Sequence, residues 1–215
     1  GETLAIIGAT GSGKSTIINL IPRFYDATSG EVLVNGINVL DYKVKDLRNL
    51  VAIASQKAAL FKGTIQDNIT YGSPIIDQER MDMALDIAKA DFVKDLEQGL
   101  DSMVAQGGSN FSGGQKQRIS IARALYKNAP IIIFDDTFSA LDYKTDMLVR
   151  KKIKENLKDT TVIIIAQRIG TIMNADNIIV LDEGKIIGMG THKQLLKSCS
   201  LYQEIALSQL SKEEL

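Results

Sequence analysis

The clearest candidate for chemistry is a glycine-rich stretch near the N-terminus, Gly8-Ala9-Thr10-Gly11-Ser12-Gly13-Lys14-Ser15-Thr16. It matches the pattern GxxxxGK[ST], which joins a strand to a helix and cradles phosphate groups with backbone N–H groups. Glycines let the backbone turn those groups inward, and Lys14 adds a charge for the β- and γ-phosphates. The Ser15 hydroxyl suits a phosphate-bound Mg²⁺. The loop therefore predicts ATP or GTP binding.

The flanking residues supply the strand and helix that this pattern requires. Residues 4–7 form an apolar run, and the segment after the loop has isoleucines and a leucine along one helical face. This context disfavours the alternative, a chance match in a glycine-rich turn. Apolar runs at 51–54, 131–134 and 161–166 predict further buried strands, so we expect an α/β fold with a mostly parallel sheet.

Polar residues follow three of these predicted strands. Gln56 lies just after the first, Asp135 and Asp136 after the second, and Gln167 after the third. In open α/β folds, ligands bind at the carboxyl ends of the strands. We therefore expect these side chains near the phosphate site, although Gln56 alone would more simply be a polar residue ending a strand.

A second candidate site follows a segment with helical character. Between residues 61 and 104, turns are expected at 63–65 and 72–74, and Met81, Ala84, Leu85 and Ala88 have helical spacing. After it comes Phe111-Ser112-Gly113-Gly114-Gln115. Ser112 and Gln115 have the spacing of a capping box, so a helix should begin here. Its N-terminus is a second place suited to an anion.

Five further features concern local structure. Hairpins are expected over 31–40, around Asn35-Gly36, and over 178–187. Thr191 should cap a closing helix, and His192, the only histidine, is expected at the surface without chemistry. The basic residues of the helix after Asp142 are expected to form a solvated face.

Composition limits the classes of partner and compartment. The chain has 215 residues and a net charge of −1, which argues against nucleic acid as a main partner. Cys199 is the only cysteine, so a reducing compartment is expected. No apolar run approaches the roughly 18 residues that cross a bilayer, so a membrane link should come through another segment or chain. Because Gly1 almost begins the first predicted strand, we expect the sequence to be a fragment.

Four elements in this order resemble the nucleotide-binding domain of ATP-binding cassette (ABC) transporters. They are the glycine loop, Gln56, the segment 111–115, and the run 131–136 followed by Ser139-Ala140-Leu141-Asp142. Segments 23–26, 63–65 and 190–192 resemble the exporter branch, bacterial multidrug exporters included. The resemblance extends to about Leu207. It implies a P-loop NTPase core over 1–57 and 116–215, a small antiparallel part truncated at the N-terminus, and a helical insertion over 58–115 that ends in the signature motif, all in one domain.

The resemblance also implies roles for single residues. Gly8 to Thr16 would bind ATP, and Ser15, Gln56 and Asp135 would reach Mg²⁺ directly or through water. Ser112, Gly113, Gly114 and Gln115 would contact the γ-phosphate of ATP held by a second nucleotide-binding domain, and Asp142 would communicate across that dimer. The domain would work with a transmembrane domain at the cytoplasmic face of the cell membrane.

Two positions depart from the family pattern. The catalytic base is usually Glu, but this chain has Asp136, whose side chain is shorter by roughly 1.5 Å. A misplacement of about 1 Å can cost on the order of a hundredfold in rate. The switch position is usually His, but Gln167 cannot become cationic. Because the signature departs only at Phe111, these residues predict a heterodimer in which this chain's own site is degenerate.

Two alternatives remain open. One is a regulatory module that binds ATP with little or no turnover, which the departures at Asp136 and Gln167 also favour. The other is a non-transport ATPase of the same class, although residues 57–110 are too few for the long coiled-coil arms of such proteins. The transported substrate is not encoded here, and the aromatic residue that stacks on adenine is expected upstream of Gly1.

Overall fold

The computed structural model describes residues 1–73 and 75–211, which fall into two compact units. Unit 1 comprises Gly1–Ala52, Ala129–Asp135 and the segment from Asp159 onward, and unit 2 comprises Ile53–Asn128 and Asp136–Lys158. Pro74, expected in a turn, and residues 212–215 of the expected domain lie outside the described residues. The units have other boundaries than the core and insertion inferred from the sequence, and that division stays a prediction.

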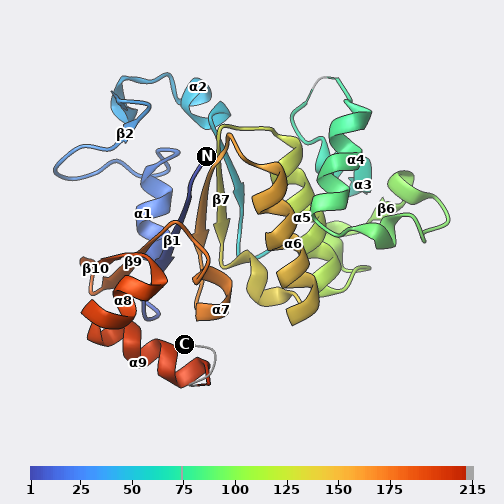
Figure 1. Cartoon of the computed structure of the whole chain (residues 1–215). Helices are drawn as coiled ribbons and strands as arrows, with labels where there is room; N and C mark the ends of the chain where they lie inside the picture. The colour runs from blue at the N-terminus through green and yellow to red at the C-terminus, as the bar shows by residue number, and fades with distance from the viewer. Residues whose placement is uncertain (74, 212–215) are drawn as a thin grey trace. The chain divides into compact units, whose positions relative to one another are not determined.

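The main sheet has the strand order β10-β9-β1-β8-β7-β4 (Figure 1). Strands β9, β1, β8 and β7 pair in parallel, whereas β10 pairs antiparallel with β9. The bounds are β1 (Thr3–Ile7), β4 (Val51–Ala54), β7 (Ile131–Asp135), β8 (Thr161–Ile165), β9 (Asn177–Asp182) and β10 (Lys185–Gly190). These strands belong to unit 1, except that β4 ends in unit 2. The predicted α/β fold with a mostly parallel sheet is confirmed.

The central strands of unit 1 end at the same level of the sheet. In β7 three consecutive residues are buried, and in β8 four are, as expected for parallel strands covered on both faces. The register pairs Ile165 with Ile6 on one side and with Asp135 on the other. The residues that follow β1, β7 and β8 therefore lie along one edge of the sheet.

A short hairpin in unit 1 joins β2 (Leu33–Val34) to β3 (Ile37–Asn38). Asn35 and Gly36 have φ angles of 52° and 76°, as a two-residue turn requires. The predicted hairpin is confirmed, but its strands are shorter than expected. The Asn38 side chain accepts a hydrogen bond from the Leu40 N–H and caps a 3₁₀ helix over Val39–Asp41.

The helices of unit 1 are α1 (Lys14–Leu20), α2 (Val44–Asn49), α7 (Ile169–Ile172), α8 (His192–Ser198) and α9 (Ser200–Gln209). Thr191 and Gln194 form the predicted capping box at the start of α8. The sequence predicted one closing helix, and the structure has two, because the backbone becomes extended at Cys199.

His192 corrects an expectation. Its side chain was expected at the surface, but the residue is only 7% exposed, and its Nδ1 lies 2.8 Å from the Tyr202 hydroxyl of α9. Burial, and then the charge of Lys193, lower the pKa of His192. Burial raises the pKa of Tyr202 to about 12. The histidine therefore joins the two closing helices, and its burial favours the neutral form.

Unit 2 is mostly helical. Its α-helices are α3 (Ile65–Ile69), α4 (Gln78–Ile87), α5 (Gly113–Tyr126) and α6 (Tyr143–Asn156), with 3₁₀ helices at Asp91–Val93, Gly99–Asp101, Gln106–Gly108 and Thr137–Ala140. The predicted helix around Met81 and Leu85 is confirmed as α4, where both are buried. The expected turn at 63–65 is instead β5 (Gly63–Thr64), which pairs with β6 (Met103–Val104), while Thr64 caps α3.

The basic residues of α6 are less solvated than expected. Arg150 donates to the buried carboxylate of Asp146, with 2.6 Å between Nε and Oδ1. Lys152 forms an ion pair with Asp86 of α4. Lys151 and Lys154 are exposed. One side of this helix therefore holds unit 2 together, and only the other forms the predicted solvated face.

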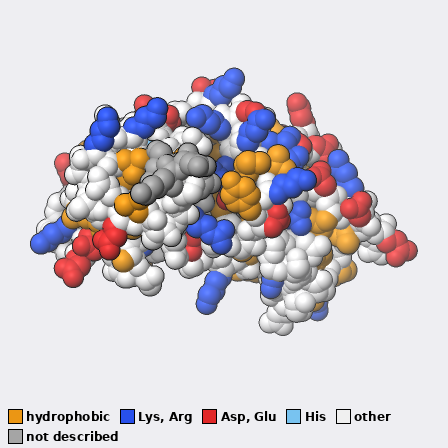
Figure 2. Space-filling view, turned by 60° about the horizontal axis from the view of Figure 1, so that its bottom comes forward, with side chains coloured by type: hydrophobic (Ala, Val, Ile, Leu, Met, Phe, Trp, Pro, Cys, Tyr) orange, Lys and Arg blue, Asp and Glu red, His pale blue; other side chains and the backbone are white. Residues whose placement is uncertain are grey.

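The surface carries both signs of charge. On the face drawn in Figure 2, Lys and Arg side chains lie among Asp and Glu side chains without forming a continuous field of one sign. Within residues 1–73 and 75–211, none of the helices has the length and apolar character that crossing a bilayer requires.

Candidate functional site

The glycine-rich loop of unit 1 lies between β1 and α1, as its sequence predicted. Gly13 stands at the start of α1 with a φ angle of 98°, in the left-handed region that favours glycine. At Gly8 the constraint is space, since a Cβ atom there would lie 2.0 Å from the backbone oxygen of Leu181. The loop thus packs directly against the end of β9.

Lys14 is held at the centre of this loop. The residue is only 9% exposed, and its Nζ donates to the backbone oxygens of Gly8 and Ala9 at 2.8 and 2.7 Å. The Ser12 hydroxyl accepts a third bond at 3.3 Å. Ser15 and Thr16, in the first turn of α1, are exposed. The loop therefore presents a fixed cation beside accessible hydroxyl groups, an arrangement that suits a phosphate and its metal.

Two further predicted site residues belong to unit 1 and lie at the same sheet edge. Asp135 is the last residue of β7 and is partly buried. Gln167 comes two residues after the end of β8 and is exposed. Since β1, β8 and β7 end together, the register brings the glycine loop, Asp135 and Gln167 to one edge, as expected for a doubly wound sheet.

In unit 2, two residues predicted to act in catalysis contact each other. The Gln56 Nε2 donates to the Asp136 Oδ2 at 2.9 Å. Asp136 is 7% exposed and has a φ angle of 46°, unusual for a residue other than glycine. Its backbone oxygen accepts a bond from the Ser139 hydroxyl at 2.7 Å. The carboxylate is therefore fixed in direction toward Gln56.

Two residues that the sequence did not single out position the segment leading to Gln56. The Thr137 hydroxyl donates to the backbone oxygen of Ala54 at 2.7 Å. The Gln117 Nε2 donates to the backbone oxygen of Ser55 at 3.0 Å. Their place in the chain was the only signal, since one follows Asp136 and the other lies two residues after Gln115.

The second predicted anion site, at the start of α5, is also in unit 2. The Ser112 hydroxyl accepts from the Gln115 N–H, and the Gln115 side chain accepts from the Ser112 N–H, which is the predicted capping box. Ser112 and Gly113 are exposed, and a Cβ at Gly113 would meet nothing within 4 Å. The capping box satisfies the N–H groups of Ser112 and Gln115, and this helix end is accessible from outside.

Asp142 has a local role in unit 2. Its carboxylate accepts from the Thr145 N–H at 3.0 Å and caps α6. Hydrogen bonds from Thr145 lower the pKa of Asp142. The residue is exposed, so the cap leaves it reachable.

Comparison with known proteins decides the family. The family model described as ABC transporter matches residues 1–139. The chain belongs to the ABC transporter family. Its fold and motifs are those of an ABC-type ATPase domain, which is a nucleotide-binding domain.

Several proteins of this family are similar to this chain in sequence. The chain is 47% identical over 213 residues to an uncharacterised ABC transporter ATP-binding protein of Mycobacterium tuberculosis, covering 97% of this chain and 36% of the relative. It is 45% identical over 207 residues to the ATP-dependent lipid A-core flippase of Photobacterium profundum, covering 95% of this chain and 35% of the flippase. It thus spans little more than a third of the length of these relatives.

A solved structure gives the same result. The structure of a bacterial Atm1-family ABC exporter with ATP bound matches with a TM-score of 0.94 and 39% identity, over 99% of this chain and 38% of that one. The family resemblance inferred from the motifs, with its exporter branch, is therefore confirmed.

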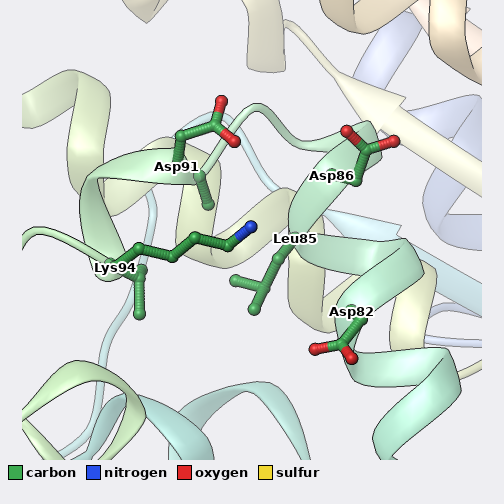
Figure 3. A pocket seen from close by; sticks show the side chains of 7 residues that line it. Asp82, Leu85, Asp86, Asp91 and Lys94 are labelled. Atoms are coloured by element: carbon green, nitrogen blue, oxygen red, sulfur yellow. The ribbon is translucent and has the colours of Figure 1, made fainter.

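Unit 2 also contains a pocket of about 430 Å³ that none of the predicted nucleotide-binding residues lines. It lies beside α4, and Figure 3 shows the Lys94 side chain crossing it between Asp91 and Leu85. Asp82, Asp86 and Asp91 also line it. The three carboxylates outnumber the one lysine of the lining, so this pocket disfavours the phosphates of a nucleotide.

The donor set expected for Mg²⁺ has suitable chemistry. Ser15, Asp135 and Gln56 offer a hydroxyl, a carboxylate and an amide oxygen, and Mg²⁺ prefers oxygen ligands. Gln56 uses its amide nitrogen on Asp136, so its oxygen is the atom that suits a cation. Among the described residues no three His, Cys, Asp or Glu side chains form a metal cluster.

Proposed function

We propose that this chain is the ATP-binding half of a heterodimeric ABC exporter, in which its own site turns ATP over slowly and its signature motif completes the active site of a second domain. The observation that carries the proposal is the pair Asp136 and Gln167, which replace the usual Glu and His, beside an intact Ser112-Gly113-Gly114-Gln115. Gly8 to Thr16 would hold the phosphates, with Mg²⁺ reached by Ser15, Gln56 and Asp135.

The contacts of Asp136 support slow turnover. A general base must come within hydrogen-bond reach of the water that it activates. The Asp136 side chain is one methylene shorter than Glu, it is nearly buried, and one of its oxygens accepts from Gln56 at 2.9 Å. A carboxylate held in this way can orient water but is poorly placed to take its proton. Gln167 can hydrogen-bond a γ-phosphate but cannot carry a positive charge.

The form of the signature helix supports a role toward a partner. Ser112 and Gly113 are exposed, and the capping box fixes the start of α5 without a ligand. A second nucleotide-binding domain could therefore reach this end without any rearrangement of it. ATP between the two domains would hold them together, and hydrolysis at the competent site would release them, a change that a transmembrane domain can transmit.

The relatives support an exporter but leave the substrate open. One relative is named as a lipid A-core flippase and another belongs to the Atm1 family, so similar ATP-binding parts occur in exporters of different names. We infer that this chain works at the cytoplasmic face of a membrane through a transmembrane domain, which would select the substrate.

A double substitution tests the proposal. We expect the wild-type chain to hydrolyse ATP slowly, and Asp136→Glu with Gln167→His to raise turnover at least tenfold, since a reaching base contributes about a hundredfold or more. Gln203→Ala, in α9, serves as a control that should leave turnover unchanged. Fast wild-type turnover that the double substitution does not alter would contradict the proposal.

A regulatory ATP-binding module is the second candidate, because the same two replacements favour it. A candidate partner domain distinguishes the two. If Ser112→Ala in this chain lowers ATP turnover by the mixture, the signature serves the partner's active site. A pure binding module would contribute no ATP turnover, either alone or in the mixture with the partner domain.

A further inference from the structure

The last residue of α9 contacts the backbone on both sides of Arg168, next to the switch position. The Gln209 Nε2 donates to the backbone oxygen of Gln167 at 2.9 Å. The Gln209 Oε1 accepts from the backbone N–H of Ile169 at 2.8 Å. All of these residues belong to unit 1, where α9 packs beside α7 (Figure 1). One side chain, 42 residues further along the chain, thus binds two backbone groups of the switch segment.

The backbone N–H of Ile169 needs a partner outside its own helix, and the same Gln209 side chain also donates to the backbone oxygen of Gln167. Strand β8 ends at Ile165, and α7 begins at Ile169. The first N–H groups of a helix have no partner within the helix, and Arg168, at the N-cap position, supplies no side-chain hydrogen bond. A glutamine amide offers one donor and one acceptor in a plane, as a peptide group does. Gln209 can therefore satisfy both groups together and fix the backbone between them.

Helix α9 is itself firmly placed. Tyr202 and Ala206 are both 0% exposed, and with Gln209 they lie four and then three residues apart, on one face of the helix. The Tyr202 hydroxyl also lies 2.8 Å from the His192 Nδ1, at the start of α8. The buried face of α9 thus sets the position from which Gln209 reaches the switch segment.

We propose that Gln209 is a positioning residue for Gln167. It holds the backbone of residues 167–169 so that the Gln167 side chain is directed to the γ-phosphate of ATP. This inference rests on the proposed function, which assigns the γ-phosphate contact to Gln167. Gln209 itself touches neither the nucleotide nor the reacting atoms.

The affinities of the full chain for ATP and for ADP, each with Mg²⁺, test the inference. Gln209→Ala should lower the affinity for ATP about threefold to tenfold, the size of one or two lost hydrogen bonds, and leave the affinity for ADP unchanged. Gln209→Glu, which keeps the acceptor for Ile169 but places a carboxylate against the Gln167 oxygen, should act in the same direction. The ratio of the ATP affinity to the ADP affinity distinguishes loss of positioning from general destabilisation of the fold. Destabilisation would lower both affinities.

Gln203→Ala is the matched control. It removes a second glutamine of α9, whose side chain donates to the backbone oxygen of Leu196 and does not contact the switch segment. It should leave the ratio unchanged. Amide hydrogen exchange gives a direct structural readout, since Gln209→Ala should speed exchange at Ile169 and Gln203→Ala should not.

A double-substitution cycle with Gln167→Ala separates this inference from the proposed function. If Gln167→Ala lowers the ratio and Gln209→Ala adds nothing to it, both hold. Suppose that Gln167→Ala lowers the ratio, but that Gln209→Ala alone leaves either the ratio or the amide exchange at Ile169 unchanged. Either result shows that the inference is wrong, while the proposed contact between Gln167 and the γ-phosphate stands. If Gln167→Ala leaves the ratio unchanged, the γ-phosphate contact is wrong, and the inference fails with it.

Discussion

The two helix ends that suit an anion are built in opposite ways. Helix α1, in unit 1, begins after the left-handed Gly13 without a side-chain cap, and its loop packs against the backbone of β9. Helix α5, in unit 2, begins with the capping box of Ser112 and Gln115. A Cβ at its first residue, Gly113, would meet nothing within 4 Å. The first end is closely fitted to its own unit. The second is held by its own capping box and is exposed, as a surface that binds another molecule would be.

Replacing one glycine by alanine at each helix end should give the largest difference in stability between the two ends. Gly8→Ala would place a Cβ 2.0 Å from the Leu181 oxygen, which side-chain rotation cannot relieve, so we expect unfolding to become easier by about 3 kcal/mol. Nucleotide binding should be lost with it. Gly113→Ala meets nothing within 4 Å and should change stability by less than about 0.5 kcal/mol. Urea titration and ATP titration measure both. Equal stability of the two variants would contradict the claim that only the first helix end is closely fitted to its own unit.

Removing the cap of α5 should have a smaller effect. Ser112→Ala loses the hydrogen bond from the Gln115 N–H, which should cost about 1 kcal/mol of stability. Thr191→Ala, which removes the matching capping box of α8, should cost about as much. Only Ser112→Ala should also lower ATP turnover in a mixture with the proposed partner domain. If both variants, measured by urea titration and by turnover, lose activity equally, the signature helix has no special role toward a partner.

The smallest effect concerns the capped start of α8 and depends on pH. Helix α8 has the same capping box as α5, but its first residue is the buried His192, whose Nε2 has no hydrogen-bond partner among the described residues. Burial lowers the pKa of His192 from its ordinary 6.5, so folding favours the neutral form. Stability should therefore be full above about pH 6.5 and fall as the pH decreases below it. Urea midpoints at pH 7.5 and 5.5 should differ more for wild type than for His192→Gln. An identical shift in both proteins would count against this assignment.

Local patterns in the sequence predicted much of the fold. The apolar runs became β1, β4, β7 and β8, Asn35-Gly36 became a two-residue turn, and the capping boxes at Ser112 and Thr191 formed as expected. The pairing of β5 with β6 was missed, because strands of two residues have no periodicity to detect. His192 was placed wrongly, because its burial depends on Tyr202 in another helix.

The candidate site was predictable in its residue types but not in its contacts. The glycine loop and the ends of the strands follow from local sequence and from the geometry of parallel sheets. The bond between Gln56 and Asp136 joins residues 80 positions apart, and that between Gln209 and Gln167 joins residues 42 apart. Neither segment carries a local signal of the other. Such contacts are fixed by tertiary packing, which a single sequence does not display.

The most direct test compares ATP affinity of the isolated chain in two variants, one for each helix end. We predict that Lys14→Ala weakens ATP binding at least tenfold, as the loss of a charged hydrogen bond to phosphate should. Ser112→Ala should leave ATP binding unchanged, because in the proposed function that helix end contacts the nucleotide of a partner domain. Full ATP affinity in Lys14→Ala, or an equal loss in Ser112→Ala, would contradict the division of roles between the two loops.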